Sequence, residues 1–294
     1  MMKTPNPILQ ALPVVLLASM LWGGCSELKD NLPAGTNPAI SVHAEGWTDP
    51  ASTNFHGKAI VADSWNMRSC RTCHGTDYTG GVAEASCRRC HTGTGGPENC
   101  ATCHGDPNSP APPKDLAGNT STASPGVGAH TKHVQGGSLA PKVWCYECHT
   151  VPTSVYAAGH VDSDLPAEVP MNGPLASTVS AGIMPAPSHD YGALTCSDSY
   201  CHGNWRSERA TSPYSFAYTD SFMIGANAIP VWTGGSAEAA CGTCHGLPPA
   251  GHIPVSIAIC GDCHLGVVDA DGKIADKTLH INGKINVFES ERSF

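Results

Sequence analysis

Cys70-Arg71-Thr72-Cys73-His74 opens a stretch that continues with Cys87-Arg88-Arg89-Cys90-His91 and ends with Cys100-Ala101-Thr102-Cys103-His104. Each segment reads C-x-x-C-H, which is the attachment pattern of a c-type haem. The two cysteine sulfurs form thioether bonds to the porphyrin, and the histidine binds its iron. Because the three copies leave little protein between neighbouring porphyrins, we expect the rest of the chain to supply packing and further iron ligands.

The pattern returns in Cys145–His149, Cys241–His245 and Cys260–His264, and a longer C-x4-C-H form spans Cys196–His202. Seven sites use 14 of the 15 cysteines. The predicted thioether residues are Cys70, Cys73, Cys87, Cys90, Cys100, Cys103, Cys145, Cys148, Cys196, Cys201, Cys241, Cys244, Cys260 and Cys263. The predicted proximal iron ligands are His74, His91, His104, His149, His202, His245 and His264. The alternative of zinc ribbons leaves the histidine after every second cysteine unexplained.

Eight of the 15 histidines lie outside these motifs, which is close to the seven needed as second axial ligands. The candidates are His43, His56, His130, His133, His160, His189, His252 and His280. We therefore predict that most or all haems have two histidine ligands. Such haems pass electrons rather than bind substrate, because both axial positions are filled. Met67, Met171, Met184 and Met223 are alternative ligands, although packing is the simpler interpretation of each.

The composition does not favour an ordinary protein core. The chain of 294 residues has 32 Gly and 24 Pro, with 5 Phe, 7 Tyr and 6 Trp. Porphyrins can take the place of a core, so we expect folding to depend on haem, as small metal domains depend on their metal. The predicted fold class is a mostly irregular, haem-nucleated multihaem cytochrome c. We expect short helices at the motifs and a few hairpins near the C-terminus, turning at Asp271-Gly272 and Asn282-Gly283.

The N-terminus has the pattern of an export signal. Lys3 is followed by an apolar run at 8–22, too short and too near the terminus for a confident membrane-spanning helix. Leu21-Trp22-Gly23-Gly24-Cys25 resembles a bacterial lipobox, with its leucine one place further upstream than usual. We expect residues 1–24 to be a signal peptide and Cys25 to be lipidated. The alternative is ordinary cleavage nearby with Cys25 unmodified.

The remaining chain is predicted to form four parts. Residues 25–42 are expected to be a lipid anchor and tether, and residues 43–105 an N-terminal three-haem region. Residues 106–128 are rich in Pro, Ser, Gly and Thr and read as a linker, although a surface loop within one domain is the alternative. Residues 129–294 are expected to be a C-terminal four-haem region.

From about Gly128 to Val287 the chain resembles the C-x4-C-H/C-x2-C-H multihaem cytochromes of metal-reducing bacteria of the Geobacter type. The matching pieces, in order, are GAHTKHV, ECHTVP, GHVD, CSDSYCHGN, PVWTGG, CGTCHGLPPAGH, CGDCH and LHINGKINV, and NFHGK and CRTCHGTDYTGG are similar too. The resemblance implies a haem bound through Cys196 and electron transfer outside the cytoplasm, often by surface lipoproteins or conduit subunits. His189 has no place in the pattern, so we expect it to be the spare histidine.

These observations predict an exported lipoprotein anchored to the outer membrane, on its periplasmic or cell-surface side, that relays electrons through seven covalent haems. Anaerobic or extracellular respiration is the expected setting, with other cytochromes or outer-membrane conduit proteins as partners. The formal charge of −9 shows no basic footprint for nucleic acid, and we expect no catalytic residues. The alternatives are a multihaem reductase with one open haem, and a subunit of a polymeric cytochrome filament in which the spare histidine binds a haem of the next copy.

Overall fold

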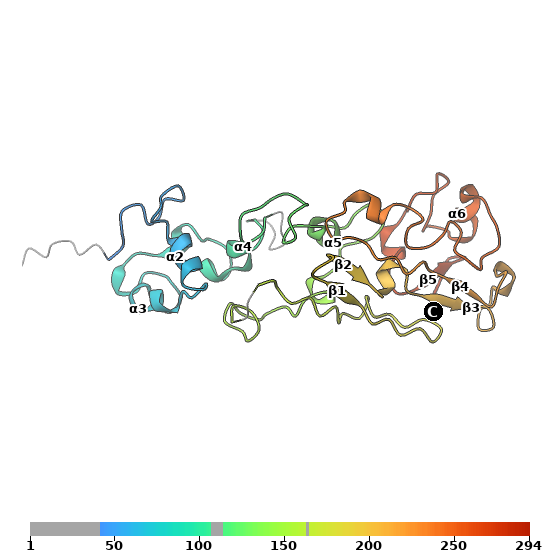
Figure 1. Ribbon diagram of the computed structural model, residues 1–294, viewed down its shortest axis with the longest axis horizontal. Coiled ribbons are helices and arrows are strands. Elements are labelled where there is room, and N and C mark those ends of the chain that lie inside the picture. Colours follow the sequence, from blue (N-terminus) through green and yellow to red (C-terminus); the bar gives the residue numbers. More distant parts are fainter. Residues whose placement is uncertain (1–41, 107–113, 163–164) are drawn as a thin grey trace, which may run out of the picture. The chain divides into compact units, whose positions relative to one another are not determined.

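The computed structural model describes residues 42–106, 114–162 and 165–294 (Figure 1). The chain divides into two compact units, Met1–Val61 and Ala62–Phe294. The predicted signal peptide and Cys25 lie outside the described residues. Within the described ranges, no helix combines the length and the apolar character needed to cross a membrane.

The helices of the described residues are short, and seven of the fifteen overlap a cysteine motif. The α-helices are α2 (His56–Ala62), α3 (Arg71–His74), α4 (Cys100–Cys103), α5 (His130–Val134) and α6 (Cys260–Cys263). The 3₁₀ turns are Arg68–Cys70, Gly81–Ala83, Cys87–Arg89, Gly96–Glu98, Cys145–Glu147, Tyr200–His202, Ser215–Ala217, Ser236–Ala239, Ile257–Ile259 and Lys277–Leu279. Helices of one or two turns are not stable alone, because nucleation costs more than so few hydrogen bonds return. Contacts outside each helix must therefore hold it.

Three antiparallel hairpins lie in the C-terminal part of the chain (Figure 1). They pair β1 (Ser188–Asp190) with β2 (Thr195–Ser197), β3 (Arg206–Glu208) with β4 (Phe222–Ile224), and β5 (Ile285–Val287) with β6 (Ser290–Arg292). The end of β6 contacts the connection between β3 and β4, because the Arg292 guanidinium donates to Ser212 Oγ at 3.2 Å. The predicted fold class, mostly irregular with short helices at the motifs and C-terminal hairpins, is confirmed.

The two predicted hairpin turns differ in outcome. Gly272 adopts a φ of +75°, and the chain closes around it with a bridge between Val268 and Ile274. The prediction for Asn282-Gly283 is wrong, because the turn between β5 and β6 is Phe288-Glu289, with φ of +48° and +56°. Tertiary contacts explain this choice, since the Phe288 N–H donates to the Cys263 carbonyl at 2.7 Å and its ring packs against Tyr214 at 5.1 Å.

The interior contains few apolar side chains. Among the described residues, those that are buried are Met67, Tyr78, Val127, Met171, Ala176, Tyr200, Tyr218 and Val267. Other large apolar side chains are exposed, among them Val82 at 85% and Trp144 at 54%. A domain of this size normally buries most of the surface that its unfolded chain exposes. The side chains alone therefore do not provide an ordinary core, which agrees with the expectation that porphyrins supply it.

Candidate haem-binding sites

Four of the cysteine motifs are closed by the same backbone hydrogen bond. In each, the histidine N–H donates to the carbonyl of the first cysteine, which makes one helical turn of the whole motif. The bonds are His91 to Cys87 (3.0 Å), His104 to Cys100 (2.9 Å), His149 to Cys145 (2.9 Å) and His264 to Cys260 (2.9 Å). This turn keeps the histidine close to both cysteines. The motif at Cys241–His245 follows the 3₁₀ turn Ser236–Ala239 and has no helix of its own.

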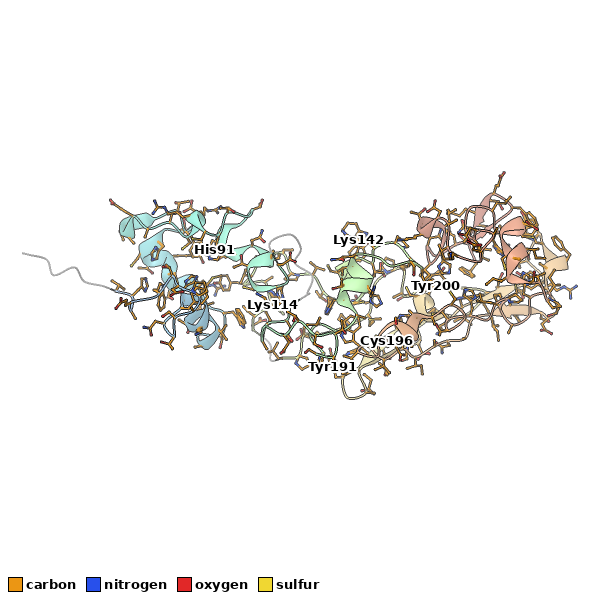
Figure 2. All side chains as sticks on the ribbon, turned by 90° about the horizontal axis from the view of Figure 1, so that it is seen from above. His91, Lys114, Lys142, Tyr191, Cys196 and Tyr200 are labelled. Atoms are coloured by element: carbon orange, nitrogen blue, oxygen red, sulfur yellow. The ribbon has the colours of Figure 1, made fainter. Side chains whose placement is uncertain are left out.

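The C-x4-C-H motif is longer because its two cysteines lie in different elements. Cys196 is on strand β2, opposite His189 on β1, whereas Cys201 is in the 3₁₀ turn Tyr200–His202. Between them the chain turns sharply at Asp198, with a φ of +55°, and the Ser199 hydroxyl caps the 3₁₀ turn by accepting from the His202 N–H at 3.3 Å. The two additional residues thus take the chain from a strand into a turn. Figure 2 marks this segment with Cys196 and Tyr200.

Histidines of the attachment motifs face candidate distal histidines in pairs. The ring centroids of His104 and His160 lie 6.0 Å apart, those of His130 and His149 6.2 Å, those of His133 and His202 6.4 Å, and those of His245 and His280 6.3 Å. Each pair joins one predicted proximal ligand with one predicted distal ligand. The members of a pair come from separate segments of the chain.

The separation within these pairs is the one that an iron between two imidazoles requires. A metal–imidazole bond is about 2.0 Å long and a ring centroid lies about 1.1 Å from its nitrogen, so two imidazoles on opposite sides of one metal have centroids about 6.2 Å apart. The four observed distances range from 6.0 to 6.4 Å. The donor pairs therefore fit a haem iron.

Burial lowers the pKa of His264, its hydrogen bond to the Asn286 carbonyl raises it, and the charges of His252 and His245 lower it again. The pairing of His264 with His252 stays a prediction. The remaining proximal candidates, His74 and His91, belong to the unit Ala62–Phe294, while His43 and His56 belong to the other unit. Their roles stay predictions.

Backbone carbonyls orient most of these imidazoles. Nδ1 hydrogen-bonds to a carbonyl oxygen at 2.6–3.1 Å in ten histidines, namely His56, His74, His130, His133, His149, His160, His245, His252, His264 and His280. A carbonyl can only accept, so Nδ1 carries the proton and Nε2 keeps its lone pair for a metal. Metal-ligating histidines show this same arrangement, which fixes tautomer and ring orientation. His202 differs, because its Nδ1 is buried and no acceptor among the described residues reaches it.

Burial keeps several of these imidazoles neutral. It lowers the pKa of His130 and of His202 to about 4, and it also lowers the pKa of His104 and His280. A neutral imidazole is the form that binds a metal. The buried histidines are therefore in the ligating state without first having to lose a proton near pH 7.

One helix carries a member of two pairs. His130 and His133 stand three residues apart on α5, so the pairs His130–His149 and His133–His202 share one turn of helix. Burial lowers the pKa of His104, and the charges of His160 and His149 lower it further.

Some side chains that pack against the candidate ligands could not be predicted from the sequence. The Trp232 ring packs edge-on against His130 at 4.7 Å and tilted against His133 at 5.6 Å, and its Nε1–H donates to the Pro125 carbonyl at 2.8 Å. Gly128 lies directly beneath this ring, where a Cβ would collide with the indole. The motif PVWTGG drew attention to Trp232, but no sequence signal indicates that it supports two ligands at once.

A polar network links the first cysteine motifs to the segment before His160. Tyr156 accepts from the Met67 N–H at 2.8 Å, and the Arg68 guanidinium lies 4.2 Å above its ring. Arg71 forms an ion pair with Glu98, and buried Tyr78 donates to the same carboxylate at 2.7 Å. The contacts of Tyr156 with Met67 and Arg68, and the His104–His160 pair, join residues on the two sides of the stretch predicted to be a linker. The division of the chain at residues 106–128 stays a prediction.

His189 stands apart from the paired histidines. Its Nδ1 faces the Cys196 sulfur at 3.7 Å, and its ring packs edge-on against Tyr191 at 4.8 Å. The described part of the chain holds no group of three or more His, Cys, Asp or Glu side chains arranged to bind a metal ion by themselves. The histidines instead meet in twos, and two is the number of axial ligands that a haem iron takes.

One comparison with known proteins finds a family model that matches part of the chain. Residues 195–245 match the family described as the Geobacter CxxxxCH...CXXCH motif. These residues include the C-x4-C-H motif at Cys196 and the C-x-x-C-H motif that ends at His245. No curated protein and no solved structure matches the chain. The chain carries c-type haem attachment motifs, and in residues 195–245 it is similar to the multihaem c-type cytochromes that share the Geobacter CxxxxCH...CXXCH motif.

Proposed function

We propose that the protein is an extracytoplasmic electron carrier with seven covalent haems. The observation that carries the proposal is the set of histidine pairs with centroids 6.0–6.4 Å apart, each pair joining a motif histidine to a distant one. A haem iron bound there supplies one-electron exchange between its ferric and ferrous states. With histidine on both sides, no axial position is left for substrate.

The proposed ligand pairs are His104 with His160, His149 with His130, His202 with His133, His245 with His280, and His264 with His252. Each attachment motif contributes the first histidine and two thioether sulfurs. The backbone carbonyls that accept from Nδ1 hold the rings, so that little reorganisation accompanies a change of charge at the iron. Rigid ligands of this kind suit a carrier, because electron transfer slows when its surroundings must rearrange.

The shared helix α5 supports a relay in which the sites follow one another in sequence order from Cys100 to His264, because it carries the distal candidates of two successive sites. We infer that electrons enter at one end of this series and leave at the other. Other cytochromes or outer-membrane conduit proteins are the proposed partners, and a lipid on Cys25 is the proposed anchor to the outer membrane.

Spectra of the purified holoprotein test this proposal against a reductase with one open haem. We expect optical and electron paramagnetic resonance spectra of low-spin haem throughout, because the proposal gives every iron two histidine ligands. Carbon monoxide is expected to leave the spectrum of the reduced protein unchanged. One stoichiometric high-spin haem that binds carbon monoxide would contradict a pure carrier and favour the reductase.

A further inference from the structure

Glu147 is a buried carboxylate inside an attachment motif. It is the third residue of Cys145–His149 and only 5% exposed. Its Oε2 accepts from the backbone N–H groups of Leu175 at 3.0 Å and Ala176 at 3.1 Å. The Gly173 N–H donates to the Glu147 carbonyl at 3.2 Å, and a Cβ at Gly173 would collide with the glutamate itself. The chain is therefore built closely around this side chain.

No basic side chain among the described residues forms an ion pair with this carboxylate. Across the residues that the structure describes, the ion pairs are Arg71 with Glu98 and Lys273 with Asp271, and Glu147 takes part in neither. Two backbone N–H donors stabilise the charged form of a carboxylate without cancelling its charge. Because the site is buried, solvent and salt screen this charge poorly. Glu147 thus places a negative charge in the interior.

The charge lies between two attachment motifs. Glu147 is adjacent to Cys148 in sequence, and Ala176, which donates to its carboxylate, accepts from the Tyr200 N–H at 2.9 Å, next to Cys201. A single residue, Ala176, thus connects this carboxylate to the second motif.

We propose that Glu147 is a fixed negative charge that lowers the reduction potentials of the two haems bound at Cys145–His149 and Cys196–His202. This inference rests on the proposed function. Ferric haem carries one more positive charge than ferrous haem, so a buried anion favours the ferric state. A unit charge about 10 Å away, at an effective dielectric constant of about 20, changes an equilibrium constant roughly tenfold.

The chain offers a matched control for this position. Asp262 is the third residue of Cys260–His264, as Glu147 is of its own motif, but Asp262 is exposed. Glu147→Gln keeps the shape and an oxygen acceptor for both N–H groups while removing the charge. Asp262→Asn removes the same charge at the same motif position, where water already screens it. Glu147→Asp keeps the charge but is too short to keep both hydrogen bonds, so it separates charge from geometry.

The test is a spectroelectrochemical titration of each full-length holoprotein, preceded by peptide mass spectrometry to establish which motifs carry haem. In Glu147→Gln we expect the reduction potentials of two haems to become more positive by about 59 mV. For a one-electron couple, this shift corresponds to a change of about tenfold in the equilibrium constant. We expect Glu147→Asp and Asp262→Asn to titrate like the wild type.

If both motifs carry haem in Glu147→Gln and their potentials are unchanged, this inference is overturned and the proposed function is not. A Glu147→Asp protein that shifts like Glu147→Gln, or an equal shift in Asp262→Asn, would also overturn it. Absence of haem from both motifs in the wild type would overturn the proposed function as well.

Discussion

Without covalent haem, the chain is expected to lose its cooperative fold. The described residues bury few apolar side chains, and one-turn helices such as α3 and α4 do not persist unaided. Without haem, the facing imidazoles of His104 and His160 lose the metal that would bridge them. Small metal domains that lack a core unfold for the same reason when their metal is withdrawn.

Expression in a host without the c-type haem attachment system provides the test. Circular dichroism and thermal unfolding are compared with those of the holoprotein, and brief proteolysis shows which segments stay protected. We expect the haem-free chain to show no cooperative transition and to be cleaved throughout residues 62–294. A haem-free chain with a sharp transition and protected hairpins would contradict the account, since its protein contacts alone would then be sufficient.

Replacing His160 by alanine is expected to open one haem and leave the others unchanged. In the proposed pairing, His160 is the second ligand of the iron held by Cys100–His104, and the ring centroids of the two histidines lie 6.0 Å apart. Loss of its imidazole leaves an axial position to water or to an added ligand. We expect one haem equivalent to become high-spin and to bind carbon monoxide when reduced, as measured by electron paramagnetic resonance and by difference spectra.

His189→Ala is the matched control. It removes the same side chain from a histidine that faces the Cys196 sulfur rather than another imidazole. We expect its spectra to stay low-spin and its carbon monoxide response to stay absent. A high-spin haem in His189→Ala, or wholly low-spin spectra in His160→Ala, would show that the pairing is wrong.

The attachment motifs and the irregular fold follow from the sequence, because C-x-x-C-H is a local pattern that forms one turn. The arrangement of the histidine rings does not. His160 lies beyond the motif at Cys145–His149, yet its ring faces that of His104, and His280 lies beyond the motif at Cys260–His264, yet its ring faces that of His245. Such interleaving depends on how distant segments cross, and no spacing rule records it. Counting histidines predicted that pairs exist, but not which pairs.

The groups that orient and support the candidate ligands could be predicted even less well from the sequence. The acceptors for His264 and His280 are the backbone carbonyls of Asn286 and Leu139, which carry no signature in the sequence. Glu147 and Asp262 occupy equivalent motif positions, and only the fold makes one buried and the other exposed. The prediction of a hairpin turn at Asn282-Gly283 was wrong because packing of Phe288 favours another turn. Tertiary context decided each of these cases.

The central claim, that sulfur-linked haems form both the interior and the electron path, is tested most directly by mass spectrometry of the mature protein from a competent host. The account predicts seven haem adducts on the intact chain and a haem on the peptide of each motif, including the one with Cys196 and Cys201. Fewer than seven adducts, or free thiols at Cys196 and Cys201 in a folded protein, would contradict it.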